Sequence, residues 1–198
     1  MHIGIDFDNT IISYDSVFNT IGVKKGLIPD DLEPGKSFVR NYLRERDQEK
    51  EWTWLQGYVY GTKLDVASPY EGVKDFLQYC SENRIDCSII SHKTTYPYSG
   101  DQYNLHTAAS DWIKKQKINL EPFFELTKED KVKRIANLKC DFFIDDLPEF
   151  LAMPGFPEHM VKVLFDPLET YASQDYDYSY ATSWEKIRLI IKKHINSK

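Results

Sequence analysis

Short apolar runs alternate along this chain with longer segments in which apolar residues recur every three or four positions. The short, continuous runs predict buried strands, and the recurring positions predict amphipathic helices. The predicted strands cover residues 2–6, 87–91, 123–126, 142–145 and 161–165, of which 123–126 is expected at a sheet edge. The predicted helices cover 73–83, 105–117, a segment that Thr127 begins as N-cap, and 184–194. Strands that alternate with helices are typical of an α/β fold with a doubly wound parallel sheet.

The segment between the first two strands is longer and helical throughout. From Ser16 to Lys63 the apolar positions follow helical spacing, and Pro29 and the turn at 33–35 divide the segment into separate helices. A helix that connects two parallel strands usually needs only about 10 to 15 residues. We therefore expect a small helical cap, residues 13–67, inserted into a core domain that consists of residues 1–12 and 68–198. A tyrosine-rich polar loop is expected at 171–180.

Composition limits the kind of protein this is. At 198 residues and 41% apolar content, the chain is long enough to bury one core. A net charge of −6 argues against a broad surface for nucleic-acid polymers or anionic membranes. No apolar stretch approaches the roughly 20 residues that a membrane span needs, and the strand pattern at residue 2 differs from a signal peptide. We expect a cytoplasmic protein with a small ligand, and the three cysteines are expected to be reduced thiols.

Oxygen-bearing residues follow three of the predicted strands. Asp6 and then Asp8 follow the first, Ser91 ends the second, and Asp145 and Asp146 follow the run at 142–144. The carboxyl ends of parallel strands meet at one edge of a sheet, which is where such folds bind ligands. Each residue alone could cap a helix or end a strand. Four carboxylates at one point would repel each other, and Mg²⁺ would offset that repulsion, so the set predicts a magnesium site.

These residues resemble the four sequence motifs of the haloacid dehalogenase (HAD) superfamily of phosphohydrolases. In chain order the matching residues are Asp6, Asp8 and Thr10 in the first motif, Ser91 in the second, Lys131 (or Lys128) in the third, and Asp145 with Asp146 in the fourth. All four occur in the order of the family, and the helical insertion falls where the family places a type 1 cap. The resemblance covers the expected core domain.

The resemblance implies a phosphatase mechanism. Asp6 would attack phosphorus and form an aspartyl-phosphate, and Asp8 would protonate the leaving oxygen and then deprotonate water. Family members that cleave other bonds lack the second acid, so Asp8 favours a phosphatase or phosphotransferase. Ser91 and Lys131 would bind phosphoryl oxygens. Thr10 is expected to order the turn through its hydroxyl group.

The resemblance also implies a ligand set for Mg²⁺. Asp6, the main-chain carbonyl of Asp8 and Asp146 would bind the metal directly. Asp145 would act through a water molecule, although Asp145 and Asp146 could exchange these roles. Glu149 is a further candidate for an outer position.

Substrate selection is expected from the cap and from the loop at 92–104. His92, Lys93 and Tyr96 are the specificity candidates, because they follow the second motif. The predicted substrate is a small phosphorylated metabolite such as a sugar phosphate. A 5′-nucleotidase-like hydrolase of (deoxy)nucleotides is the first alternative, and a catalytically inactive HAD-fold binding protein is the second. Transfer of the phosphoryl group to an acceptor other than water also stays open.

Overall fold

The computed structural model describes residues 1–172 and 177–197. Within these ranges it contains a six-stranded sheet in the order β5-β4-β1-β6-β7-β8, in which all paired strands are parallel. The strands are β1 (His2–Ile5), β4 (Asp86–His92), β5 (Pro122–Glu125), β6 (Phe142–Asp145), β7 (Val161–Phe165) and β8 (Ser179–Ala181). The predicted parallel sheet is confirmed, and β5 lies at its edge as expected.

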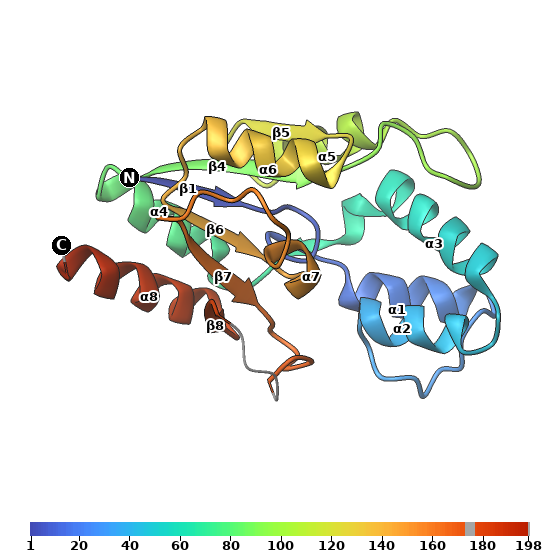
Figure 1. Ribbon diagram of the computed structural model, residues 1–198. Helices are drawn as coiled ribbons and strands as arrows, with labels where there is room; N and C mark the ends of the chain where they lie inside the picture. The colour runs from blue at the N-terminus through green and yellow to red at the C-terminus, as the bar shows by residue number, and fades with distance from the viewer. Residues whose placement is uncertain (173–176, 198) are drawn as a thin grey trace. The chain divides into compact units, whose positions relative to one another are not determined.

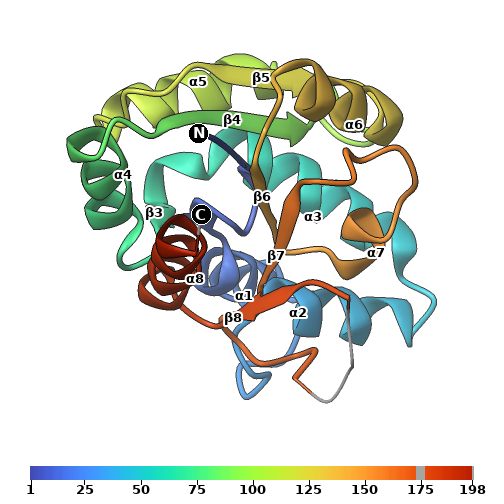
Figure 2. The same ribbon diagram turned by 60° about the vertical axis from the view of Figure 1, so that its left-hand side comes forward.

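Helices cover both faces of this sheet. They are α4 (Val73–Glu82), α6 (Lys128–Asn137), α7 (Pro148–Leu151) and α8 (Trp184–Asn196). In Figures 1 and 2, α4 and α8 lie on one face, and α6 and α7 lie on the other. The sheet is therefore doubly wound, as the alternation of strands and helices predicts. The short elements α7 and β8 were not predicted. Because β8 occupies 179–181, the expected loop ends earlier, and its residues 173–176 lie outside the described ranges.

Contacts within the chain group it into two compact units. The sheet unit contains Met1–Ile11, Pro69–His92 and Leu120–Lys198, and the helical unit contains Ile12–Ser68 and Lys93–Asn119. The helical unit holds α1 (Asp15–Lys24), α2 (Lys36–Arg44), α3 (Glu49–Thr62), the 3₁₀ helix η1 (Leu64–Val66) and α5 (Leu105–Lys115). A separate two-stranded sheet pairs β2 (Ile12–Ser13) with β3 (Ser68–Pro69). The expected domain limits stay a prediction, but residues 93–119 group with the helices of the expected cap.

Two features of the central strands explain why they stay together. Ile3 and Ile5 point to one face of the sheet and are fully buried, and Gly4 and Asp6, which alternate with them, are buried as well. This is expected for a strand that is covered on both faces. A Cβ atom at Gly4 would lie 2.7 Å from Cδ2 of Phe143, so glycine allows this ring to pack closely on β1. The apolar cluster around Phe143 includes side chains from α6 and α7. This cluster supports the strand ends at which the polar residues lie.

None of the described helices is both long and apolar enough to cross a membrane. Cys80 and Cys140 are buried, Cys87 is half-buried, and all three are free thiols.

Candidate functional site

The register of the sheet aligns the carboxyl ends of its central strands. Ile5 of β1 pairs with Ile89 of β4 on one side and with Ile144 of β6 on the other. The backbone N–H of Asp6 then donates a hydrogen bond of 2.9 Å to the carbonyl of Ile144. Asp6 and Asp145 therefore leave neighbouring strands at the same level. This is the arrangement that the sequence predicts for the two residues.

Lys131 of α6 connects these two carboxylates. Its Nζ donates to Oδ1 of Asp6 at 2.6 Å and to Oδ2 of Asp145 at 2.7 Å. The three residues are 3%, 5% and 0% exposed, so the two ion pairs are almost completely shielded from water. Among the described residues these bonds are made by Lys131 and not by Lys128, which lies at the start of the same helix. Ser91 of β4 is also buried.

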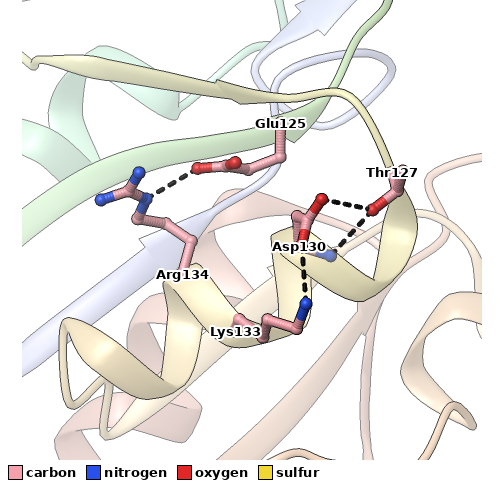
Figure 3. Close-up of polar contacts among 5 residues, drawn as sticks. All are labelled: Glu125, Thr127, Asp130, Lys133 and Arg134. Atoms are coloured by element: carbon pink, nitrogen blue, oxygen red, sulfur yellow. Dashed lines mark hydrogen bonds and ion pairs between the residues drawn. The ribbon is translucent and has the colours of Figure 1, made fainter.

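The start of α6 is fixed by the cap that the sequence predicts. Oγ1 of Thr127 accepts a hydrogen bond from the backbone N–H of Asp130 and donates one to Oδ2 of the same residue, at 3.0 and 2.8 Å (Figure 3). Nζ of Lys133 donates to the other oxygen of Asp130 at 2.9 Å. The capping acid is therefore an Asp, although Glu or Gln is usual at this position.

A second contact fixes how α6 is turned about its own axis. Nε of Arg134 donates to Oε1 of Glu125 at 2.7 Å, which ties the helix to strand β5 (Figure 3). Val132 and Ile135 of the same helix are buried in the apolar core. Because these contacts set the rotation of the helix, Lys131 is directed toward the carboxylates and away from solvent.

Charge is not balanced within this buried group. Burial alone lowers the pKa of Lys131, but the charges of Asp145 and Asp6 and their hydrogen bonds outweigh it, so the pKa is raised above its ordinary value. Burial has the largest effect on Asp145 and raises the pKa of this carboxyl to about 6; the charge of Lys131 opposes the rise and that of Asp6 adds to it. One ammonium therefore faces two carboxylates. A further cation would be stabilised here.

The same carboxylates can hold that cation. Asp6, Asp145 and Asp146 each offer an oxygen atom, and these atoms lie within 4.8 Å of one another. Both oxygens of Asp145 already accept hydrogen bonds, Oδ2 from Lys131 and Oδ1 from the backbone N–H of Leu147 at 2.9 Å. A compact set of carboxylate oxygens that is partly buried suits Mg²⁺, so the residues present fit this metal.

Of the four carboxylates expected to meet, those of Asp6, Asp145 and Asp146 form this group of described residues, and the roles expected of Asp8 and of the outer candidate Glu149 stay predictions. The carboxylates of Asp8 and Glu149 lie outside it, and Glu149 is exposed on α7. Asn9, in the turn that follows Asp8, has a positive φ of 60°, a conformation that Asn tolerates better than most residues.

The expected role of Thr10 in this turn is wrong. Thr10 is fully buried, and within the described residues its hydroxyl oxygen has no hydrogen-bond partner. The backbone closes the turn instead, because Ile11 donates its N–H to the carbonyl of Phe7 at 3.1 Å. Hydrogen bonds between main-chain groups thus replace the side-chain bond that the sequence suggests.

The three specificity candidates belong to different units. His92 lies in the sheet unit, where its Nε2 donates to the carbonyl of Leu126 at 3.2 Å, and burial lowers the pKa of its imidazole. Lys93 lies in the helical unit and is 4% exposed, with Nζ 4.8 Å from the ring centroid of Tyr60. Tyr96 is half exposed in the same unit. His92 thus groups with the sheet unit, Lys93 and Tyr96 group with the helical unit, and their role in substrate selection stays a prediction.

A buried acid at the same edge of the sheet escaped the sequence analysis. Asp166 follows β7 and is 4% exposed. Its carboxylate accepts hydrogen bonds from the backbone N–H groups of Thr170 and Tyr171 and from the hydroxyl of Tyr180, at 3.0, 2.7 and 3.0 Å. The only sequence signal was the Asp-Pro pair after a strand. Because three donors satisfy the carboxylate, Asp166 anchors the following loop.

Neither protein-family models nor curated proteins match this sequence, whereas solved structures do. A HAD-superfamily hydrolase from Ehrlichia chaffeensis is similar over 98% of this chain and 97% of its own, with a TM-score of 0.60 and 17% identity. A predicted phosphatase from Clostridium acetobutylicum is similar over 97% and 98%, with a TM-score of 0.61 and 13% identity. The HAD-hydrolase YfnB from Bacillus subtilis, described as bound to magnesium, is similar over 96% and 97%, with a TM-score of 0.50 and 10% identity. The fold that the sequence motifs imply is confirmed.

Proposed function

We propose that this chain, which has the fold of the HAD-superfamily hydrolases, is a Mg²⁺-dependent hydrolase of phosphomonoesters. The observation that carries the proposal is the buried contact of Lys131 with Asp6 and Asp145, within reach of Asp146. It combines a nucleophile, a fixed positive charge and metal ligands at the ends of adjacent strands. The match to a predicted phosphatase supports the same class of reaction.

The first chemical step assigns a role to each acid of the first motif. A carboxylate oxygen of Asp6 attacks phosphorus, and the bond between phosphorus and the leaving oxygen breaks. Asp8 gives its proton to that oxygen. In the second step Asp8 takes a proton from water, whose oxygen attacks phosphorus, and the carboxylate of Asp6 is released together with inorganic phosphate.

Two other residues hold the phosphoryl group. The ammonium of Lys131 contacts Asp6 directly, so it lies where negative charge develops on the phosphoryl oxygens. Because it is buried, this charge acts in a region of low dielectric constant, where it is worth more than in water. Ser91, at the end of β4, supplies a hydroxyl group to the same oxygens.

Mg²⁺ would be held by Asp6, the main-chain carbonyl of Asp8 and Asp146. When bound, the metal offsets the negative charge of the phosphoryl oxygens. Asp146 is favoured as the direct ligand because both oxygens of Asp145 already accept hydrogen bonds. The magnesium-bound structure of YfnB supports this choice of metal.

The proposed substrate is a small phosphorylated metabolite such as a sugar phosphate, selected by His92, Lys93 and Tyr96. Nucleotides are the alternative substrates, and a panel that contains both nucleotides and sugar phosphates has to distinguish the two classes. A role as an inactive binding protein is disfavoured because such a protein needs no acid–base group two residues after a nucleophile. Transfer of the phosphoryl group to a different acceptor would use the same residues.

The test is turnover of an aryl phosphate and of a panel of nucleotides and sugar phosphates. We expect Asp6→Asn to lower kcat by roughly a thousandfold or more, since the amide is a poor nucleophile. The exposed carboxylate of Asp75 on α4 offers a control, and Asp75→Asn should leave kcat within about twofold. Undiminished turnover by Asp6→Asn would sink the mechanism. A wild-type protein that binds panel compounds without hydrolysing any would support the binding role.

A further inference from the structure

His92 is the last residue of β4, and it has a partner in the edge strand β5. The register of the two strands pairs it with Glu125. Paired residues of neighbouring strands point to the same face of a sheet, and Glu125 points toward α6, where it binds Arg134 (Figure 3). The imidazole of His92 therefore lies on the α6 face of the sheet, where Lys131 of the same helix contacts Asp6.

One ring nitrogen of His92 is fixed by the backbone. Its Nε2 lies 3.2 Å from the carbonyl oxygen of Leu126, the residue immediately before the N-cap of α6. A carbonyl oxygen only accepts hydrogen bonds, so the proton of the ring is on Nε2. In a neutral imidazole the other nitrogen, Nδ1, then carries a lone pair and can only accept. Among the described residues no group donates to Nδ1, and it is not one of the buried polar atoms without a partner, so it is open to a ligand.

The surroundings of His92 favour the neutral ring. Burial has the largest effect and lowers the pKa of the imidazole below its ordinary value, whereas the hydrogen bond to Leu126 raises it. Among the nearby charges, those of Lys131 and Lys128 lower the pKa and that of Asp6 raises it. The net shift of the pKa is downward, so the protonated ring, which would bind an anion, is disfavoured at neutral pH. His92 is thus a hydrogen-bond acceptor rather than a cation.

An acceptor at this place limits the chemical group that it can bind. Phosphoryl and carboxylate oxygens are acceptors themselves, so they do not pair with Nδ1 of His92. A hydroxyl group donates its proton to such a nitrogen and brings no charge. An ammonium group would donate as well, but the charges of Lys131 and Lys128 reach the same ring and would repel it. The group that fits is therefore an uncharged hydroxyl.

We propose that His92 is a specificity-determining residue, which accepts at Nδ1 a hydrogen bond from a hydroxyl group of the leaving group. The substrate class is then a polyol phosphate or a sugar phosphate. His92 shares the α6 face of the sheet with Lys131 and Asp6. Since a hydrogen bond spans about 3 Å, the hydroxyl group is expected within roughly two or three carbon atoms of the ester oxygen. This inference rests on the proposed hydrolase function and makes its substrate class more specific.

The kinetic test compares two leaving groups that differ only in hydroxyl groups. The probes are glycerol 3-phosphate and propyl phosphate, which have the same carbon chain. We expect kcat/KM of the wild type to be about tenfold higher for glycerol 3-phosphate, which is the size of a typical hydrogen bond between neutral groups. His92→Phe keeps a flat ring but removes the acceptor, so its preference should fall to within about twofold of unity. A loss that affects both probes equally cancels in this ratio.

Two further variants test the acceptor itself. His92→Asn can place an amide oxygen near the position of Nδ1, so it should keep the preference within about threefold of wild type. His159, an exposed residue of the same unit, offers the matched control. His159→Phe makes the same chemical change at a distance from the site, and it should leave the preference unchanged.

A second measurement needs no substrate and observes the ring in the wild-type protein. The ¹⁵N NMR spectrum of its histidines reports which ring nitrogens carry a proton, and the signals of His92 are those that disappear in the His92 variants. At pH 7 we expect a proton on Nε2 and none on Nδ1. A ring that is protonated at both nitrogens, or at Nδ1 alone, would overturn the assignment of Nδ1 as an acceptor.

The outcomes separate this inference from the proposed function. If the wild type hydrolyses an aryl phosphate but does not prefer glycerol 3-phosphate to propyl phosphate, or if His92→Phe keeps the wild-type preference, the inference is overturned and the hydrolase proposal stands. If His92→Asn loses the preference as completely as His92→Phe, the role of Nδ1 as acceptor is overturned as well. If the wild type hydrolyses neither the aryl phosphate nor the two probes, the hydrolase proposal fails, and with it the role of His92 in substrate selection.

Discussion

Lys131 is the residue on which the charge balance of the candidate site depends. Its ammonium is the one positive group bonded to the buried carboxylates of Asp6 and Asp145 among the described residues. Truncating one partner of a buried ion pair typically costs about 3 to 5 kcal/mol, because the remaining charge is left buried without compensation. Lys131 is therefore expected to support both the folded state and the chemistry.

This dual role predicts two measurable losses. Lys131→Met should lower kcat by at least about a hundredfold, since a fixed charge at the phosphoryl oxygens is removed. It should also lower the melting temperature. Lys128→Met, on the same helix, should change neither by much, and it serves as the matched control in both the kinetic assay and a thermal melt. Equal losses in the two variants would contradict the assignment of the site lysine.

The raised pKa of Asp145 predicts how the stability of the folded chain depends on pH when no divalent cation is present. Its pKa is raised from 3.8 to about 6 in the folded state, so between these values the folded chain binds more protons than the unfolded chain. Stability contributed by this group therefore falls as pH rises through the window. A shift of this size corresponds to about 3 kcal/mol at most.

The comparison of wild type with Asp145→Asn isolates this effect from other carboxylates. The stability of the variant relative to wild type should rise between pH 4 and pH 7, because the amide cannot ionise. Urea unfolding in the presence of a chelator measures it. If the free energy of unfolding of the variant minus that of wild type is constant over this pH range, or falls, the charged form of Asp145 is not unfavourable in the folded state.

At the scale of elements, strands were predicted better than turns. The apolar runs of β1, β4 and β6 are buried on both faces, and burial of that kind leaves an unmistakable pattern in the sequence. The turn after Asp6 was not predicted correctly, because Thr10 and Asn9 suit several turns and the choice among them depends on main-chain hydrogen bonds. Strand β8 was missed because three residues carry too little periodicity.

The N-cap of helix α6, Thr127, is a local sequence signal that helps to position Lys131 in the site. Removing the cap with Thr127→Ala should cost about 1 kcal/mol of stability, as N-cap substitutions usually do, and Thr127→Ser should restore most of it. Urea unfolding measures the change. Because the Arg134–Glu125 pair still holds the helix to β5, kcat should fall by much less than in Lys131→Met. A loss of stability that serine does not restore would show that the Thr127 hydroxyl is not the capping group.

At the scale of the whole molecule, the sequence could predict the sheet and the residues at its edge, but not how the remaining segments group. The motif residues Asp6, Lys131 and Asp145 meet because parallel strands align their ends and a capped helix fixes its own direction. The assignment of residues 93–119 to the helical unit depends on contacts with α3 that are distant in sequence. In the sequence, such contacts are marked only by isolated glycines. A glycine within a helix can have several causes, so it does not identify the segment that packs against it.

Binding of Mg²⁺ to this fold should be visible as stability. A ligand that binds only the folded chain adds about 2.7 kcal/mol when its concentration is a hundred times its dissociation constant. We expect added Mg²⁺ to raise the melting temperature of the wild type and a chelator to reverse the rise. Asp146→Ala should abolish this rise in melting temperature. Asp8→Ala should keep most of it, because residue 8 is proposed to bind the metal through its main-chain carbonyl, which the substitution retains. Losses of equal size in the two variants would contradict that ligand set, and a response that persists in Asp146→Ala would place the metal elsewhere.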